Sequence, residues 1–412
     1  MEIEAAQRRT VRVLALSQAL GGLGVGSGLA VGSLLVEELS GSAGLAGLAL
    51  TASVLGGAIA AVPLAGLSAR GGRRLGVGVG YALGGVGSGV VVLAAETGLV
   101  ALALVGMMLF GAATAANLQA RFAATDLAAP AGRARALSTV VWATTVGAVL
   151  GPNLAEPAGR WVAGLGLPAL AGPFLGSVVV FSGAAALLGI ALRPDPLLYA
   201  RRMHAVAAPA VPRTSLSDAF AAVARAPVAV LGLSSVVVAH AVMVAVMVMT
   251  PVHMSHGGAA LRVIGLVISV HIAGMYAFSP VIGWLTDKVG RVPVVLLGVG
   301  LLLAALIVAG TADPHASAGL GVALFLLGLG WSCGLVAGST LLTDAVSEPD
   351  RAGVQGASDL VMQLAGAAGG GLAGVVVGAA GYRSLTVVAA VLLVPVVVLA
   401  FPQLLPRRSL TG

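Results

Sequence analysis

Methionine and histidine concentrate in one short stretch of the chain. Residues 240–275 contain five of the ten methionines and four of the six histidines. Met243 and Met247 are four residues apart, as are His271 and Met275, so each pair would lie on one face of a helix. Thioether and imidazole groups are soft ligands that suit Cu(I) better than Mg²⁺, Ca²⁺ or structural zinc. Because a thioether carries no charge, such a site could hold Cu(I) and still release it.

The composition places these residues in a membrane. The 412 residues are 58% hydrophobic and 9% charged, with a mean hydropathy of +1.05, whereas soluble domains carry about 25% charged residues. Apolar stretches long enough to cross the hydrocarbon core lie at residues 13–36, 43–66, 75–95, 98–121, 136–156, 170–192, 228–252, 260–284, 293–311, 318–342, 354–378 and 384–404. We therefore expect an all-α integral membrane protein with twelve transmembrane helices. The single cysteine excludes a disulfide framework and a multi-cysteine metal centre.

The basic residues predict the orientation. With both termini in the cytoplasm, 19 of the 22 lysines and arginines fall on the cytoplasmic side, as the positive-inside rule requires. The net charge of +7 is thus explained by topology and does not indicate nucleic-acid binding. We expect a multi-pass protein of the cytoplasmic membrane, with the lipid bilayer as its surroundings and no obligate protein partner.

The chain divides into two related halves. Residues 193–227 form a polar linker with a short amphipathic piece, between six-helix bundles at residues 1–192 and 228–412. Arg73 and Arg291 are 218 residues apart, as are Asp126 and Asp344, so two charged loops share one offset. Parallel six-helix repeats joined by a linker are typical of the major facilitator architecture.

Residues 283–291 resemble the signature loop of that superfamily, G-x-L-x-D-[RK]-x-G-R. The first half carries a similar loop in which Ala69 stands at the position of the acidic residue. The resemblance implies transport by alternating access, with a charge cluster that latches the cytoplasmic helix ends. The gating residues would be Gly283, Asp287, Lys288, Gly290 and Arg291, with Arg70, Gly72 and Arg73 in the first half.

The soft residues carry a narrower resemblance. Met243-x-x-x-Met247 and His271-x-x-x-Met275 resemble the paired M-x-x-x-M and H-x-x-x-M motifs of the CcoA-like copper importers, the CalT branch of the superfamily. The step of 28 residues from Met243 to His271 also matches that pattern. Membership would imply that these four residues bind copper during uptake, which would supply haem–copper oxidase assembly. Copper would be the cargo, and no resident cofactor is expected.

Neighbouring residues could extend this site. Our own hypothesis adds His240 to the cavity wall and places His253, Met254 and His256 on the path from outside, with Cys333 as a further candidate. The competing interpretation is packing, because methionine commonly fills irregular cores. Histidines at a span end could also sit in water at the headgroup level.

Other polar residues within the spans leave alternatives open. Asp359, with Gln363 one turn later, could couple protons or anchor a neighbouring helix. Arg121 could reach the cytoplasmic surface and pair with Asp126. Six residues of the first half could line a cavity or form hydrogen bonds between helices: Gln18, Asn117, Gln119, Trp142, Thr144 and Thr145.

Three rival functions remain. A riboflavin-type importer would need aromatic stacking, and the chain holds 16 aromatic residues. A drug–proton antiporter is less favoured, because Met107 stands where such proteins place an arginine. Residues 147–152 also resemble the antiporter motif G-x-x-x-G-P, but Asn153 to Glu156 do not complete it. A metal-binding scaffold or sensor is the third. No nucleotide-binding loop or catalytic constellation is evident in the sequence, so we do not expect an enzyme.

Overall fold

The computed structural model describes residues 2–41, 43–203, 215–259, 261–313 and 317–404. Within these ranges the regular structure consists of α-helices and two short 3-10 turns. The prediction of an all-α membrane protein is confirmed. Pure helix is the expected outcome, because hydrocarbon offers no partner for backbone polar groups and a helix satisfies them internally.

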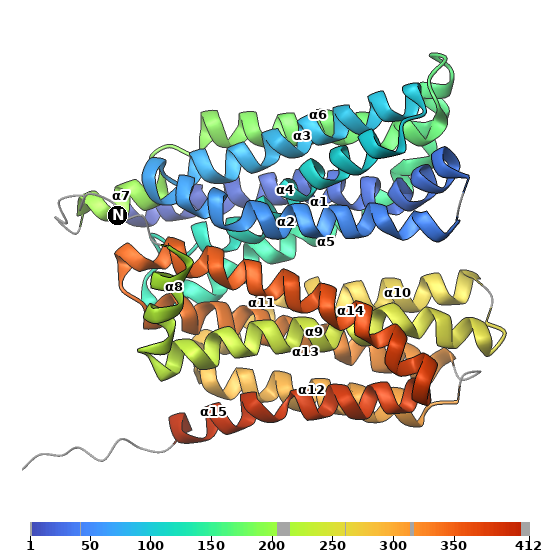
Figure 1. The fold of residues 1–412 in the computed structure, drawn as a ribbon. Coiled ribbons are helices and arrows are strands. Elements are labelled where there is room, and N and C mark those ends of the chain that lie inside the picture. The colour runs from blue at the N-terminus through green and yellow to red at the C-terminus, as the bar shows by residue number, and fades with distance from the viewer. Residues whose placement is uncertain (1, 42, 204–214, 260, 314–316, 405–412) are drawn as a thin grey trace, which may run out of the picture. The chain divides into compact units, whose positions relative to one another are not determined.

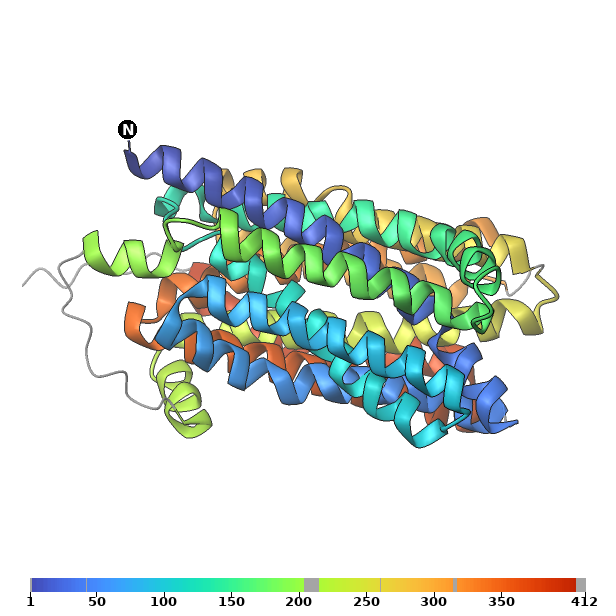
Figure 2. The same ribbon diagram turned by 90° about the horizontal axis from the view of Figure 1, so that it is seen from above.

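Six long helices make up the first half. Figure 2 shows α1 and α6 side by side along their length, and the two helices are in contact. The helices are α1 (Glu2–Ser40), α2 (Ala43–Gly71), α3 (Arg73–Thr97), α4 (Val100–Ala123), α5 (Arg133–Ala163) and α6 (Gly172–Ala191). The 3-10 turns η1 (Pro130–Gly132) and η2 (Ala169–Ala171) precede α5 and α6.

The linker and the second half follow. The linker contains α7 (Pro196–Met203) and α8 (Leu216–Ala224), the second of which coincides with the predicted amphipathic piece. The second half contains α9 (Pro227–His256), α10 (Leu261–Tyr276), α11 (Ser279–Val289), α12 (Arg291–Thr311), α13 (Ser317–Ala345), α14 (Glu348–Leu392) and α15 (Val394–Leu404).

The eighth predicted span is broken in the structure. The sequence indicated one helix over 260–284, but α10 ends at Tyr276 and α11 begins at Ser279. Pro280 stands in the first turn of α11, where its missing N–H costs little, whereas inside a continuous helix it would leave the Tyr276 carbonyl without its donor. The break lies directly after Met275.

The last two spans are joined by a sharp turn at Gly381. Eleven helical segments of the described residues are long and apolar enough to cross a membrane, and the last runs from Glu348 to Gln403. Gly381 interrupts it with a φ of 82°, a conformation that glycine adopts without strain. The chain reverses there, as Figure 1 shows for α14 and α15, so this segment crosses twice. Twelve crossings result, as predicted.

The described helices group into two compact units. One contains residues 1–219 and 348–364, and the other contains 220–347 and 365–412. The helix α14 is therefore shared between the units, with its first four turns in the unit of α1–α6. The predicted bundle limits at 192 and 228 stay a prediction.

The two signature loops have the same backbone conformation. Gly72, before α3, has φ 88° and ψ 166°, and Gly290, before α12, has φ 107° and ψ 161°. These positive φ values favour glycine over any residue with a Cβ. Each glycine lets the chain turn sharply from one crossing into the next, with Arg73 or Arg291 as the first helical residue.

The same loops form equivalent ion pairs. The Nε of Arg73 donates to Asp126 Oδ2 at 2.8 Å, and the Nε of Arg291 donates to Asp344 Oδ2 at 3.1 Å. The internal repeat is therefore present in three dimensions, with the offset that the sequence predicts.

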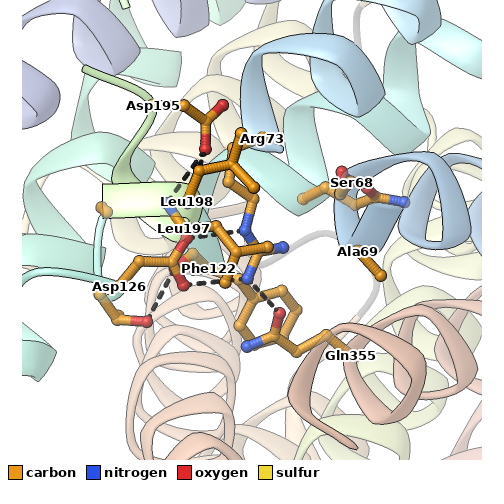
Figure 3. A network of polar contacts seen from close by, with 12 residues as sticks. Ser68, Ala69, Arg73, Phe122, Asp126, Asp195, Leu197, Leu198 and Gln355 are labelled. Atoms are coloured by element: carbon orange, nitrogen blue, oxygen red, sulfur yellow. Dashed lines mark hydrogen bonds and ion pairs between the residues drawn. The ribbon is translucent and has the colours of Figure 1, made fainter. Parts of the chain in front are cut away.

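A linker residue occupies the place left by Ala69. The backbone N–H of Arg74, in the first turn of α3, donates to Asp195 Oδ2 at 2.8 Å. The other oxygen of Asp195 accepts from the backbone of Leu197 and Leu198 in α7, as Figure 3 shows. The linker thereby supplies a carboxylate to this loop. In the second loop Asp287 is native to the motif and lies 3.9 Å from Arg291.

The remaining predicted gating residues take ordinary structural roles. Gly283 is buried within α11, and the Nζ of Lys288 lies 4.7 Å from the centre of the Trp284 ring. Arg70 is exposed at the end of α2.

Candidate functional site

The site is built on α13, against which both α9 and α10 pack. Glycines bring the backbones close. A Cβ on Gly328 would collide with the carbonyl oxygen of His271 and the backbone nitrogen of Met275, and one on Gly334 would collide with Ala239 of α9. Small residues permit this approach, which gains dispersion contacts between helices that lipid cannot drive together hydrophobically.

His271 is held in a ligand-like state. Its Nδ1 lies 2.7 Å from the carbonyl oxygen of Leu324. A carbonyl can only accept, so Nδ1 carries the proton and Nε2 presents a lone pair. His271 is completely buried, and its Nε2 has no hydrogen-bond partner among the described residues. Metal-binding histidines show this arrangement, in which one ring nitrogen donates to a carbonyl and the other faces the ion.

The register of α10 against α13 places Met275 one turn below His271. The hydrogen bond sets His271 level with Leu324, and four residues later the backbone of Met275 lies against Gly328. Both helices advance by about 1.5 Å per residue, so they run in the same direction with matched levels. Ser279 continues the match through its contact with Ser332 at 3.1 Å.

The helix α9 runs in the opposite direction along α13. Gly232 approaches Gly338, whereas eight residues later His240 accepts a hydrogen bond from Trp331 Nε1 at 3.1 Å. The two helices are therefore antiparallel, and each residue added along α9 corresponds to about one residue lower in number on α13.

Counting from that hydrogen bond assigns levels to the two methionines of α9. Met243 lies three residues beyond it, level with Gly328, and Met247 lies seven residues beyond it, level with Leu324. Ala239, which faces Gly334, is one turn before Met243, so this stripe of α9 points toward α13.

The four predicted ligands therefore lie at two adjacent levels of one unit. Met243 and Met275 share the level of Gly328, and Met247 and His271 share the level of Leu324. Met243 and Met275 are buried, and Met247 is half-buried. Three thioethers and one imidazole nitrogen at adjacent levels offer a soft donor set. That these residues bind copper stays a prediction.

His240 is in the opposite tautomer. Because the Trp331 N–H can only donate, His240 Nδ1 is the acceptor and the ring proton sits on Nε2. His240 therefore presents no lone pair in this structure, unlike His271. Trp331 also packs edge-to-face with Tyr276 at 5.6 Å. The sequence interpretation missed both aromatic residues, because neither belongs to the methionine and histidine pattern.

The additional candidates for the metal site or its entry path contact different parts of the structure. The ring of His253 stacks on Tyr382 at 4.2 Å, and Met254 packs in an apolar cluster that includes Leu324. Cys333 is buried and lies against Gly298 of α12, away from the α10 side of α13. The side chain of His256 lies outside the described residues. The path from outside that these residues were expected to form stays a prediction.

A polar network crosses the first half. Gln18 donates to the Asn117 carbonyl at 3.0 Å and to Thr144 at 3.2 Å, and Tyr81 donates to Asn117 at 2.7 Å. Gln119 donates to the carbonyl of Ala61. These contacts support the interpretation as hydrogen bonds between helices. Trp142 is exposed, and Thr145 is half-buried. Tyr81 was missed because a single aromatic residue in an apolar span gives no pattern.

The partner predicted for Arg121 is wrong. Its Nη2 donates to Asp359 Oδ1 at 2.6 Å, whereas Asp126 is bound by Arg73. Sequence proximity suggested Asp126, but a residue 238 positions away along the chain is the one that faces the guanidinium.

These features define a class of protein. Twelve membrane crossings in two sequence-related halves, with paired charged loops and buried polar side chains, are those of a polytopic transporter. Residues 231–411 match the sequence model of the Major Facilitator Superfamily. The chain is 40% identical over 402 residues to the uncharacterized MFS-type transporter YddS of Bacillus subtilis, covering 96% of this chain and 92% of the relative. The chain belongs to the major facilitator superfamily and is a transporter.

Other comparisons agree on the fold. The riboflavin transporter RfnT of Brucella anthropi is 29% identical over 363 residues, covering 87% of this chain and 86% of the relative. A bacterial homologue of the iron transporter ferroportin superposes with a TM-score of 0.73 at 16% identity, covering 95% of this chain and 98% of that structure. The human organic anion transporter MFSD10 gives 0.72 at 19% identity, covering 96% and 99%.

Proposed function

We propose that this transporter imports Cu(I) across the cytoplasmic membrane by alternating access, with both termini in the cytoplasm. The observation that carries the proposal is the buried lone pair of His271 Nε2, level with Met247 and one turn from Met243 and Met275. Copper is the cargo, bound in passage and then released. Its use in haem–copper oxidase assembly follows from the resemblance of the two motifs.

The donor set suits a transported Cu(I) ion. Neutral thioethers and imidazole satisfy a soft cation without adding a negative charge to the membrane interior. Burial removes water from the ion and leaves it only sulfur and nitrogen donors. Mg²⁺ and Ca²⁺ prefer oxygen ligands, so the site disfavours them.

Riboflavin is the second candidate. It is favoured by the relative RfnT and by the aromatic pair Tyr276–Trp331 beside His240. A flavin ring binds by stacking on an open aromatic face. Trp331 is only 3% exposed, so it offers little face to a flavin, and copper is the better supported cargo.

Cellular copper tests the proposal. A strain that lacks the gene is compared with strains that express the wild type, or Met243→Leu with Met247→Leu, at equal membrane levels. Leucine conserves the volume of methionine, so the packing cost is under about 1.5 kcal/mol per site. We expect the wild type to restore copper content and the double variant to fail. Equal copper in all three strains would contradict the proposal, and a defect in riboflavin uptake would favour the second candidate.

A further inference from the structure

An ion pair is buried where the first turns of α14 meet α4. Arg121 is 1% exposed and Asp359 is 0% exposed, and both lie in segments apolar enough to span the membrane. The Nη2 of Arg121 donates to Asp359 Oδ1 at 2.6 Å, and its Nη1 donates to the Leu118 carbonyl at 2.7 Å. The second carboxylate oxygen, Asp359 Oδ2, is buried and has no hydrogen-bond partner among the described residues.

A second buried pair in the same unit shows how Asp359 differs. Both oxygens of Asp126 accept from Arg73, at 2.8 and 3.0 Å, as Figure 3 shows. A carboxylate that accepts two hydrogen bonds from one guanidinium is stabilised in its ionised form. Asp359 accepts a hydrogen bond from Arg121 through one oxygen only. A proton could therefore add to its other oxygen without displacing a hydrogen bond.

The charged groups around Asp359 are few. Arg121 faces it from α4, and Arg73, from α3, is a second cation that acts on it. Arg73 also donates to Gln355 at 2.7 Å, one turn before Asp359. The contacting residues of α2 are small, with Gly57 against Gln363 and Ala65 against Gly356. Two arginines and two aspartates thus balance, and a proton on Asp359 would leave one positive charge in excess.

The position of the pair gives this titration a mechanical consequence. Residues 348–364 of α14 group with the first unit, while the helix continues into the second unit from residue 365. A movement of α14 with its other end would separate these first turns from α4. The Arg121–Asp359 pair is an ion pair between these turns and α4.

We propose that Asp359 is the proton-binding site that couples this transporter to the proton gradient. A proton from water adds to Oδ2 and converts the carboxylate to a neutral acid. The hydrogen bond from Arg121 to Asp359 then has an uncharged acceptor and is weaker than the charged one, and the first turns of α14 separate from α4. Loss of the proton restores the ion pair. The proposal requires that the chain be a transporter, but it does not depend on copper as the cargo.

A thiol reporter tests this without any cargo. Cys333→Ala removes the native cysteine, and Ser358→Cys places a thiol beside Asp359, at a residue buried in the structure. Labelling by a membrane-permeant maleimide is followed in vesicles from about pH 8 to about pH 5, with each rate divided by that of the denatured protein because the thiolate fraction itself falls with acid. We expect the normalised rate to rise at least about tenfold in acid. The protonated fraction of Asp359 rises about tenfold for each unit of falling pH while the carboxylate is still mostly ionised.

Variants decide whether Asp359 is the group that responds. Asp359→Asn should label rapidly at every pH, whereas the matched Asp126→Asn should keep the acid-dependent rise. Because Asp359→Asn leaves Arg121 buried without a counter-ion, the double variant Arg121→Gln with Asp359→Asn provides a neutral pair, and it should also label rapidly and independently of pH. A flat pH profile in the parent, or an acid-dependent rise that survives in either Asp359 variant, would overturn the proposal. Failure of copper uptake would leave these labelling results unchanged.

Discussion

At the residue scale, hydrogen bonding distinguishes two histidines that the sequence could not separate. His240 and His271 are both inside membrane spans and both are one turn from a methionine. Leu324 fixes the proton of His271 on Nδ1, whereas Trp331 fixes that of His240 on Nε2. Both of these partners lie on α13, more than 50 residues away along the chain from the histidine that each contacts.

This difference predicts unequal effects on copper affinity. His271→Ala should weaken Cu(I) binding at least about tenfold, or ~1.4 kcal/mol, because it removes a donor atom. His240→Gln should stay within about threefold, because the glutamine oxygen can accept from Trp331 and no ligand is lost. Competition with a chromogenic Cu(I) chelator on anaerobic purified protein measures both. An equal loss in the two variants would place His240 among the ligands.

At the element scale, the sequence predicted the crossings well and their irregularities poorly. Hydrophobic length is a local property, so the spans, the linker helix and the repeat were predictable from composition and offset. The break before Ser279 depends on Pro280, which the hydropathy pattern hides. The partner of Arg121 depends on which helix faces α4, and no local pattern records that. The four soft residues were found by spacing alone, but their two levels required the register against α13.

That register makes Gly328 a sensitive position. A methyl group there would meet backbone atoms of His271 and Met275, so α10 would have to move. Gly328→Ala should cost about 1–3 kcal/mol of stability and weaken Cu(I) binding as well. Gly321→Ala is the matched control on the same helix, because its methyl would make only an ordinary contact with Val267. Thermal unfolding of the purified proteins measures the stability difference, and similar midpoints for the two variants would refute the assigned packing.

At the scale of the whole molecule, the two halves share the positions of their loop ion pairs but not the burial of those pairs. Arg73 and Asp126 are 1% and 4% exposed, whereas Arg291 and Asp344 are 19% and 26% exposed. The first half has also lost the acidic residue of its motif and receives Asp195 from the linker instead. Equivalent ion pairs in the two halves therefore work in different surroundings.

Arginine substitutions should expose this asymmetry. Arg73→Ala leaves Asp126 buried without its counter-ion and should cost about 3–5 kcal/mol. Arg291→Ala breaks a partly exposed pair with Asp344 and a longer contact of 3.9 Å with Asp287. It should cost less than Arg73→Ala, because water screens the shorter of the two contacts. The thermal midpoint and the yield of monodisperse protein in detergent report both effects. Equal destabilisation by the two substitutions would show that the second pair is as dry as the first.

Copper uptake by the purified protein in proteoliposomes tests the central claim most directly. Radioactive Cu(I), kept reduced without oxygen, is supplied outside, and riboflavin is supplied in a parallel series. We predict saturable copper uptake by the wild type, its loss in Met243→Leu with Met247→Leu, and no riboflavin uptake. Copper uptake that the double variant retains, or riboflavin uptake in place of copper, would contradict it.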